Sequence, residues 1–276
     1  GYVLVVGALY VFQRNLLFLP ASHVGSPAAV GAGDMREVTL ATADGLALRS
    51  WYKPASDDRP TMIYFHGNGG NISHRLSLYS VLLSAGVNVL AYDYRGYGQS
   101  AGRASERGTY LDAEAALGWL RQRGFPPTRV VAHGESLGGA VAAELALRHP
   151  DLAGLILRST FTSVPDLGRE LFPFLPVRLL ASIRYDTRSK LPSVHVPVLI
   201  LHSREDTLIR FHHAEANLAA ANEPKWLREI RGDHNDQPDA SPEAYRDAVR
   251  FFLRESALAR AAGTQAARDG APDSTR

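Results

Sequence analysis

The stretch that decides the fold is Val130-Val131-Ala132-His133-Gly134-Glu135-Ser136-Leu137-Gly138-Gly139-Ala140. It begins with apolar, β-prone residues and runs into the helix-forming residues 140–146, with Gly134-x-Ser136-x-Gly138 between the two. A strand that turns at once into a helix strains the backbone of the corner residue and requires small neighbours. The turn also exposes the serine hydroxyl beside free N–H groups at the start of the helix. Because G-x-S-x-G arises by chance in roughly one chain in ten of this length, its strand-turn-helix setting is what favours a nucleophile elbow over a glycine-rich turn.

The composition excludes several classes of function. A net charge of +2 without a basic stripe argues against nucleic acid as a partner. The absence of cysteine excludes disulfides, thiolate catalysis and cysteine–zinc sites, and leaves the cellular compartment open.

Apolar runs alternate with helical patterns along most of the chain. Such alternation predicts an α/β fold with a mostly parallel sheet covered by helices on both faces. The expected strands are a hairpin at 35–40 and 46–52, then 61–65, 87–92, 129–132, 154–157, 196–201 and 225–230. Helical spacing marks 74–85, 110–120 and a final helix at 242–256.

The prediction divides the chain into five parts. Residues 1–20 are an apolar N-terminal segment, 21–34 a linker, 35–256 the catalytic domain with a small helical cap inserted at 161–193, and 257–276 a disordered tail. The cap is inferred because prolines break that region into short apolar pieces.

The N-terminal segment has three interpretations: the end of a transmembrane helix, a signal-peptide core, or a helix lying on the domain. We favour the first, which predicts a protein anchored in a membrane by one N-terminal helix, on a side that the sequence leaves open. A chain starting near Met35 is then expected to stay folded and active in solution.

A serine nucleophile needs a base, and the base needs an orienting acid. In this architecture the order is serine, acid, histidine. His234 is predicted as the base because it follows the last expected strand, in Gly232-Asp233-His234-Asn235-Asp236. Asp206 is predicted as the acid because it begins the turn after the strand ending at Leu201, with Glu205 as the alternative.

Donors for a developing oxyanion are predicted at the backbone N–H groups of Asn68 and Leu137. Asn68 lies in a glycine-rich loop after a buried strand; a phosphate-binding loop is the alternative, but the GKS/GKT ending is missing. Arg95, in the turn 93–100, is expected to pin that loop to a carboxylate. No metal site is predicted, since His212 and His213 are expected on different helix faces.

Four motifs together resemble the α/β-hydrolases, and within them the bud-emergence (Bem)-type group that includes α/β-hydrolase domain proteins thirteen and seventeen. They are Tyr64-Phe65-His66-Gly67-Asn68-Gly69-Gly70-Asn71-Ile72, Asp93-Tyr94-Arg95-Gly96-Tyr97-Gly98, Gly134-Glu135-Ser136-Leu137-Gly138-Gly139 and His234-Asn235-Asp236. The resemblance implies an α/β-hydrolase fold with an eight-stranded sheet, the triad Ser136, Asp206 and His234, no cofactor, and commonly an N-terminal membrane anchor.

The expected function is a serine hydrolase of the carboxylesterase or thioesterase type, acting on a small-molecule or lipid-like acyl substrate. A prolyl-oligopeptidase-like serine peptidase with the same triad is the alternative, and a non-catalytic scaffold is a third possibility.

Overall fold

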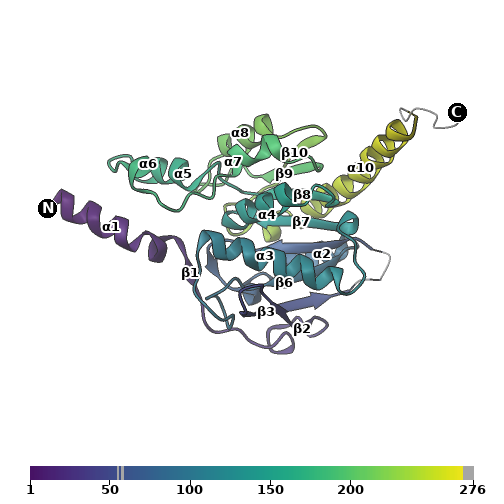
Figure 1. Ribbon diagram of the computed structural model, residues 1–276, viewed down its shortest axis with the longest axis horizontal. Helices are drawn as coiled ribbons and strands as arrows, with labels where there is room; N and C mark the ends of the chain where they lie inside the picture. Colours follow the sequence, from purple (N-terminus) through teal and green to yellow (C-terminus); the bar gives the residue numbers. More distant parts are fainter. Residues whose placement is uncertain (55, 57–58, 270–276) are drawn as a thin grey trace, which may run out of the picture.

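The computed structural model describes residues 1–54, 56 and 59–269. Its centre is an eight-stranded sheet in the order β10-β9-β8-β7-β4-β6-β3-β2 (Figure 1). β2 is antiparallel to β3 and β3 to β6, while the other neighbours are parallel. This confirms the predicted α/β-hydrolase fold. In sheet order, the strands are Lys225–Glu229, Val198–His202, Gly154–Arg158, Val130–Glu135, Thr61–Phe65, Asn88–Tyr92, Ala47–Lys53 and Arg36–Ala41.

The central strands are buried along their whole length and are mostly apolar, because both faces of the sheet are covered. In β7, Val130 and Ala132 face one apolar cluster while Val131 faces the other. The first cluster packs under α3 (Glu106–Arg121), α4 (Leu137–Arg148) and α8 (His212–Ala220). The second packs under α2 (Leu76–Ser84) and α10 (Pro242–Asp269).

The segment between β8 and β9 forms a small helical cap. It contains α5 (Val164–Leu171), α6 (Val177–Leu180), α7 (Thr187–Lys190) and the 3₁₀ turn Leu191–Ser193. α5 and α6 lie beside the N-terminal helix α1 (Tyr2–Leu17) in Figure 1. Tyr2 donates a hydrogen bond at 3.0 Å to the carbonyl of Phe174, which lies between these two cap helices.

The predicted linker 21–34, which the structure describes in full, has no helix or strand apart from the 3₁₀ turn Ala28–Val30, but it packs against the domain. Val24 and Ala32 are buried in the second apolar cluster, and the Asn71 side chain donates to the carbonyls of Ala21 and His23. Just before this stretch, Phe18 is buried in the first cluster. A cut at Met35 would remove these core residues, so we now expect a chain starting there to be less stable than the sequence alone suggests.

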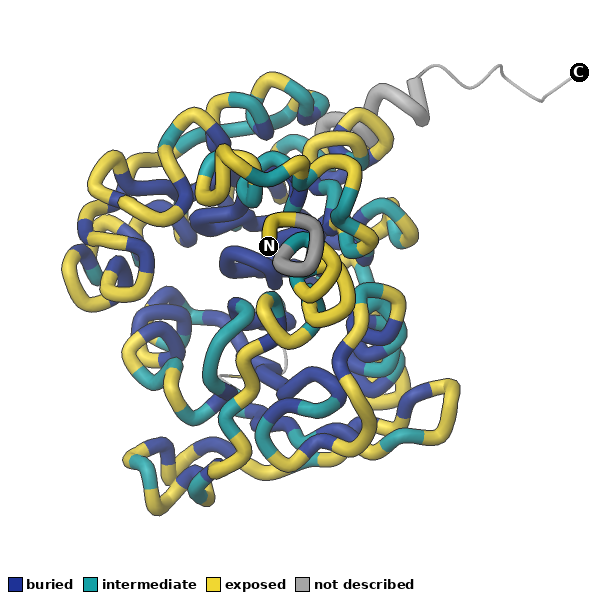
Figure 2. The backbone as a smooth tube through the Cα atoms, turned by 90° about the vertical axis from the view of Figure 1, so that its left-hand side faces the viewer, coloured by how far each residue is buried: buried dark blue, intermediate teal, exposed yellow. Residues whose placement is uncertain are grey.

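Directly after α1, the chain forms β1 (Leu19–Pro20), which pairs in parallel with β5 (Gly69–Gly70). Figure 2 looks along α1 from its N-terminal end and shows exposed residues of this helix in front of buried segments of the domain. In the part of the chain that the structure describes, no helix combines the length and the apolar character needed to span a bilayer. The membrane anchor stays a prediction.

The predicted disordered tail is wrong for residues 257–269, because α10 continues to Asp269. Alanine and arginine, which dominate this stretch, are good helix formers, and Arg260 donates a hydrogen bond to the carbonyl of Ala153. Residues 270–276 lie outside the described residues.

Candidate active site

Ser136 lies at the corner between β7 and α4 with a φ of +53°, a region that non-glycine residues avoid. Its neighbours must be small. A Cβ on Gly134 would overlap the backbone of Gly138, and one on Gly138 would overlap the carbonyl of Phe65. The turn is thus the strained, tightly packed corner that a nucleophile elbow requires.

The predicted base and acid are brought together. His234, in the loop after β10, donates from Nδ1 to Oδ2 of Asp206 at 2.8 Å, and both residues are buried. The other carboxylate oxygen of Asp206 accepts from the N–H groups of Leu208 and Ile209 at 3.1 and 2.8 Å. Burial by itself raises the pKa of Asp206, but the hydrogen bond and charge of His234 and the bond from Ile209 outweigh it and lower the pKa. The acid is therefore ionised near neutral pH.

Ser136 lies at the carboxyl end of β7, and Asp206 and His234 follow those of β9 and β10, so all three lie at the same edge of the sheet. Among the described residues, no hydrogen bond joins the Ser136 hydroxyl to His234. Such bonds are often long before substrate binds. The complete triad therefore stays a prediction.

One predicted oxyanion donor, Asn68, lies in a loop that touches the serine, and the other, Leu137, directly follows the serine. A Cβ on Gly67 would come within 3.6 Å of the Cβ of Ser136, so the loop that carries Asn68 touches the nucleophile. Leu137 is the first residue of α4, where the N–H has no acceptor within the helix. The Asn68 N–H shares its peptide plane with the carbonyl of Gly67, which lies 2.7 Å from Nδ1 of His66. The Asn68 carbonyl, in the next peptide, accepts from the N–H of Leu19 and the hydroxyl of Tyr97 at 2.9 and 2.7 Å, and these bonds fix the loop.

A buried ionic cluster beside the serine was missed by the sequence analysis. The carboxylate of Glu135 forms ion pairs with Arg158 and, at 3.4 Å, with Arg75, and accepts a hydrogen bond from Tyr64. Burial raises the pKa of Glu135, but the two arginines and Tyr64 outweigh it and hold the pKa well below its ordinary value. No signal could have shown this, because the residue before the serine in G-x-S-x-G is unrestricted.

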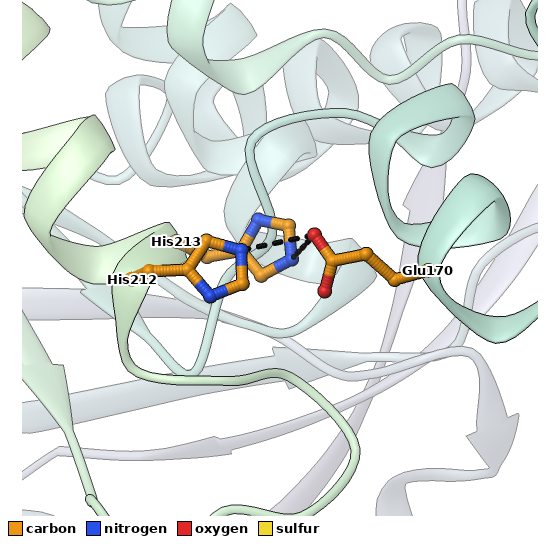
Figure 3. A group of neighbouring side chains, drawn as sticks. All are labelled: Glu170, His212 and His213. Atoms are coloured by element: carbon orange, nitrogen blue, oxygen red, sulfur yellow. Dashed lines mark hydrogen bonds and ion pairs between the residues drawn. The ribbon is translucent and has the colours of Figure 1, made fainter.

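The prediction that His212 and His213 face different sides of a helix is wrong. Their rings stack with centroids 4.4 Å apart, and both Nε2 atoms reach Oε1 of Glu170, at 2.9 and 3.3 Å (Figure 3). They lie in the first turn of α8, where both side chains turn toward α5.

This cluster is chemically unsuited to a metal. The N–H of Thr162 donates to Nδ1 of His213 at 3.2 Å, so the ring proton of neutral His213 lies on Nε2, the atom that faces Glu170. A metal ligand needs that nitrogen unprotonated. The three residues instead join the cap to α8.

Arg95 has the structural role predicted for it. Its guanidinium pairs with Asp112 at 2.8 Å and with Asp44 at 2.7 Å.

The chain is similar in sequence and in structure to known proteins. Residues 60–179 match the family model described as the alpha/beta hydrolase fold. An uncharacterized protein of Mycobacterium tuberculosis is 38% identical over 258 residues, covering 92% of each chain. Protein bem46 of Schizosaccharomyces pombe is 33% identical, covering 75% of this chain and 74% of its own. The Arabidopsis thaliana α/β-hydrolase domain-containing protein WAV2 is 33% identical, covering 93% of each.

The chain belongs to the α/β-hydrolase superfamily. It is of the Bem type, as the bem46 and WAV2 relatives show. An esterase of Pyrococcus furiosus is similar in structure, with a TM-score of 0.69 and 23% identity, covering 87% of this chain and 97% of its own. At that identity the likeness concerns the fold. Within the α/β-hydrolases, the strand-turn-helix corner and the loops after the last strands are where hydrolytic residues lie.

Proposed function

We propose that the protein is a serine hydrolase that cleaves carboxylic esters or thioesters through an acyl-enzyme. The observation that carries the proposal is the 2.8 Å hydrogen bond from His234 to Asp206, at the sheet edge where Ser136 occupies its strained corner. A bound Asp206 fixes the proton of His234 on Nδ1, which leaves Nε2 free to accept one.

In this mechanism, Nε2 of His234 takes the proton of the Ser136 hydroxyl as its oxygen attacks the substrate carbonyl. The N–H groups of Asn68 and Leu137 stabilise the oxyanion. His234 then gives the proton to the leaving alcohol or thiol as the acyl–leaving-group bond breaks. Water, activated by the same histidine, hydrolyses the acyl-enzyme and restores Ser136. No cofactor takes part in these steps.

The cap supports an apolar acyl group as substrate. Leu171, Phe172, Phe174 and Leu179 are exposed by 44%, 48%, 70% and 87%. Exposed apolar residues gathered on one segment favour contact with an apolar ligand or surface. A serine peptidase remains the alternative, without a specific observation in its favour.

The N-terminal segment supports a second proposal, that the protein associates with a membrane through α1. Tyr10, Val11, Phe12 and Leu16 are exposed by 52%, 69%, 57% and 57%. Because Tyr2 of α1 also binds the cap at Phe174, the exposed apolar residues of both lie on neighbouring elements. A lipid-like substrate would suit this arrangement.

The function is tested by labelling the protein with a fluorophosphonate and by measuring hydrolysis of nitrophenyl esters of rising chain length. Ser136→Ala should abolish labelling and lower turnover at least roughly a thousandfold. Ser80→Ala, at an exposed serine of α2, is the matched control and should behave as the wild type. Equal turnover in Ser136→Ala and the wild type would overturn the proposal.

A further inference from the structure

The side chain of Gln237 is fully buried beside the candidate acid. Gln237 is the first residue of α9 (Gln237–Ala240), three residues after His234, and none of it is exposed. Its Nε2 donates to Oδ2 of Asp206 at 3.3 Å, the same oxygen that accepts from His234.

The orientation of this amide is determined by its other contacts. Oε1 of Gln237 accepts from Nη1 of Arg158 at 3.2 Å and from the hydroxyl of Ser159 at 2.8 Å. A guanidinium only donates and an ionised carboxylate only accepts. The amide oxygen must therefore face Arg158, and the amide N–H₂ must face Asp206.

Arg158 is itself fixed. It is 2% exposed and forms a close ion pair with Glu135, the residue that precedes Ser136. Its carbonyl also accepts from the N–H of Ser136 at 2.9 Å. A continuous line of buried polar groups thus runs from Glu135 through Arg158 and Gln237 to Asp206 and His234.

Asp206 is held on both oxygens. Leu208 and Ile209 donate to Oδ1, while His234 and Gln237 donate to Oδ2. Without Gln237, Oδ2 would keep only His234 at hydrogen-bonding distance. Oδ2, the oxygen that holds the imidazole, would then be less closely fixed than Oδ1, which keeps its two backbone donors.

We propose that Gln237 is a positioning residue, which orients Asp206 and through it His234, and that Arg158, fixed by Glu135, sets the direction of its amide. This inference rests on the proposed serine-hydrolase function. Gln237 touches neither the substrate nor the reacting atoms; it acts through the acid.

Gln237→Glu is one test, because its ionised carboxylate still accepts from Arg158 and Ser159. It offers Asp206 no donor and repels it, so kcat is compared at a pH where both carboxylates are ionised. We expect kcat to fall about 10- to 100-fold, the size of one hydrogen bond to a charged group, with KM nearly unchanged. The added negative charge stabilises the imidazolium, so the acidic limb of the pH profile of kcat/KM should shift to higher pH.

The other charged and titratable groups in this region stay in place in the variant. They are Glu135 on β7, Arg158 on β8, His202 on β9, whose Nε2 is 3.7 Å from Oδ2 of Asp206, and Asp233 beside His234. The pH shift therefore reports on the substitution at Gln237.

Two further variants complete the experiment. Ser159→Ala removes one hydrogen bond to Oε1 of Gln237 and leaves the one from Arg158, so it should lower kcat much less than Gln237→Glu does. Gln237→Met removes the donor without adding charge; it should lower kcat without the upward pH shift, and it carries the test if the glutamate variant does not fold. Folding is checked by circular dichroism and thermal unfolding.

The outcomes separate the two proposals. If a folded Gln237→Glu has the wild-type kcat and pH profile, or a folded Gln237→Met keeps the wild-type kcat, the positioning role is wrong. If the wild type neither reacts with a fluorophosphonate nor hydrolyses esters, the proposed function has failed instead.

Discussion

Asp206 and Glu205 are adjacent in sequence, yet only Asp206 faces His234. Glu205 accepts from the N–H of Gly232 at 2.8 Å, away from the imidazole. We expect Asp206→Asn to keep the fold and lower turnover by an order of 10⁴, because an amide favours the wrong imidazole tautomer. Glu205→Gln, which can still accept from Gly232, should be nearly silent. Steady-state kinetics of the two variants measures this difference. A larger loss of turnover in Glu205→Gln than in Asp206→Asn would identify Glu205 as the acid.

Asp93, just after β6, gives a pH dependence of stability. Burial, opposed by a hydrogen bond from the N–H of Ile72 and by the charges of Arg49 and Arg75, raises the pKa of Asp93 to about 7 from 3.8. A raised pKa means that the folded state holds the proton more tightly. Its stabilising contribution is therefore complete below about pH 4 and is lost as the pH rises through 7.

Asp93→Asn should remove this dependence. Between pH 4 and 8, the free energy of unfolding of the wild type should fall relative to that of Asp93→Asn, by on the order of 3 kcal/mol. Urea unfolding at several pH values measures the difference. A difference that stays constant with pH would contradict the raised pKa.

At the scale of residues, the sequence predicted what depends on local pattern and chain order. Ser136 follows from its motif, and the pairing of Asp206 with His234 from their positions after consecutive strands. Gln237 and Arg158 could not be predicted, because their contact joins residues 79 positions apart and neither lies in a motif. The faces of His212 and His213 were misjudged because helical spacing does not fix side-chain directions in a first turn.

Among the elements, the elbow between β7 and α4 depends on glycines that have no room for a side chain. Gly138→Ala would place its Cβ against the carbonyl of Phe65, a backbone atom that cannot move aside. We expect a loss of several kcal/mol in the free energy of unfolding, or loss of activity through a displaced Ser136.

Gly118→Ala is the matched control, since Gly118 lies within α3 and a Cβ there meets nothing within 4 Å. It should stabilise the protein by about 0.5–1 kcal/mol, because alanine favours the helix. Thermal unfolding of both variants checks the pair; a neutral Gly138→Ala would contradict the tight packing described above.

The larger elements could be predicted because apolar runs and helical spacing mark them over five residues or more. β4, β6 and β10 begin and end within one residue of the expected limits. The β1–β5 pair could not be predicted, because each strand has two residues, and Gly69–Gly70 has no side chains to form a pattern. The predicted helix 242–256 is shorter than α10 because the prediction depended on a stripe of apolar residues. Residues 257–269 lack that stripe and are helical through helix propensity.

For the whole molecule, the N-terminal segment contains two parts with different roles. Tyr2, Tyr10, Val11 and Phe12 are exposed apolar residues. In contrast, Gln13 accepts from the N–H of Ser182 at 2.8 Å and Arg14 donates to the carbonyl of Ala104 at 2.7 Å. A chain beginning at Gln13 should therefore fold, hydrolyse soluble esters as the full chain does, and bind lipid vesicles much more weakly, since only Leu16 of the exposed large apolar residues described in α1 remains.

A chain beginning at Met35 is the comparison. It lacks Phe18, Val24 and β1, so it should unfold at lower temperature and lose most of its activity. Vesicle sedimentation, thermal unfolding and ester hydrolysis are measured for the three chains. Equal vesicle binding by the full chain and the chain from Gln13 would contradict a role for residues 1–12 at a membrane.

β1 begins two residues after the end of α1 and pairs with β5, so no flexible segment separates α1 from the loop that contains Asn68. A long flexible linker would let the domain rotate freely about its point of attachment, and the active site could then face any direction. Because α1 leads directly into β1, which pairs with β5, a surface that holds α1 would also fix the distance and orientation of Ser136 relative to that surface. Under the proposed membrane association and hydrolase activity, this geometry would restrict cleavage to acyl bonds that lie at that distance from the surface.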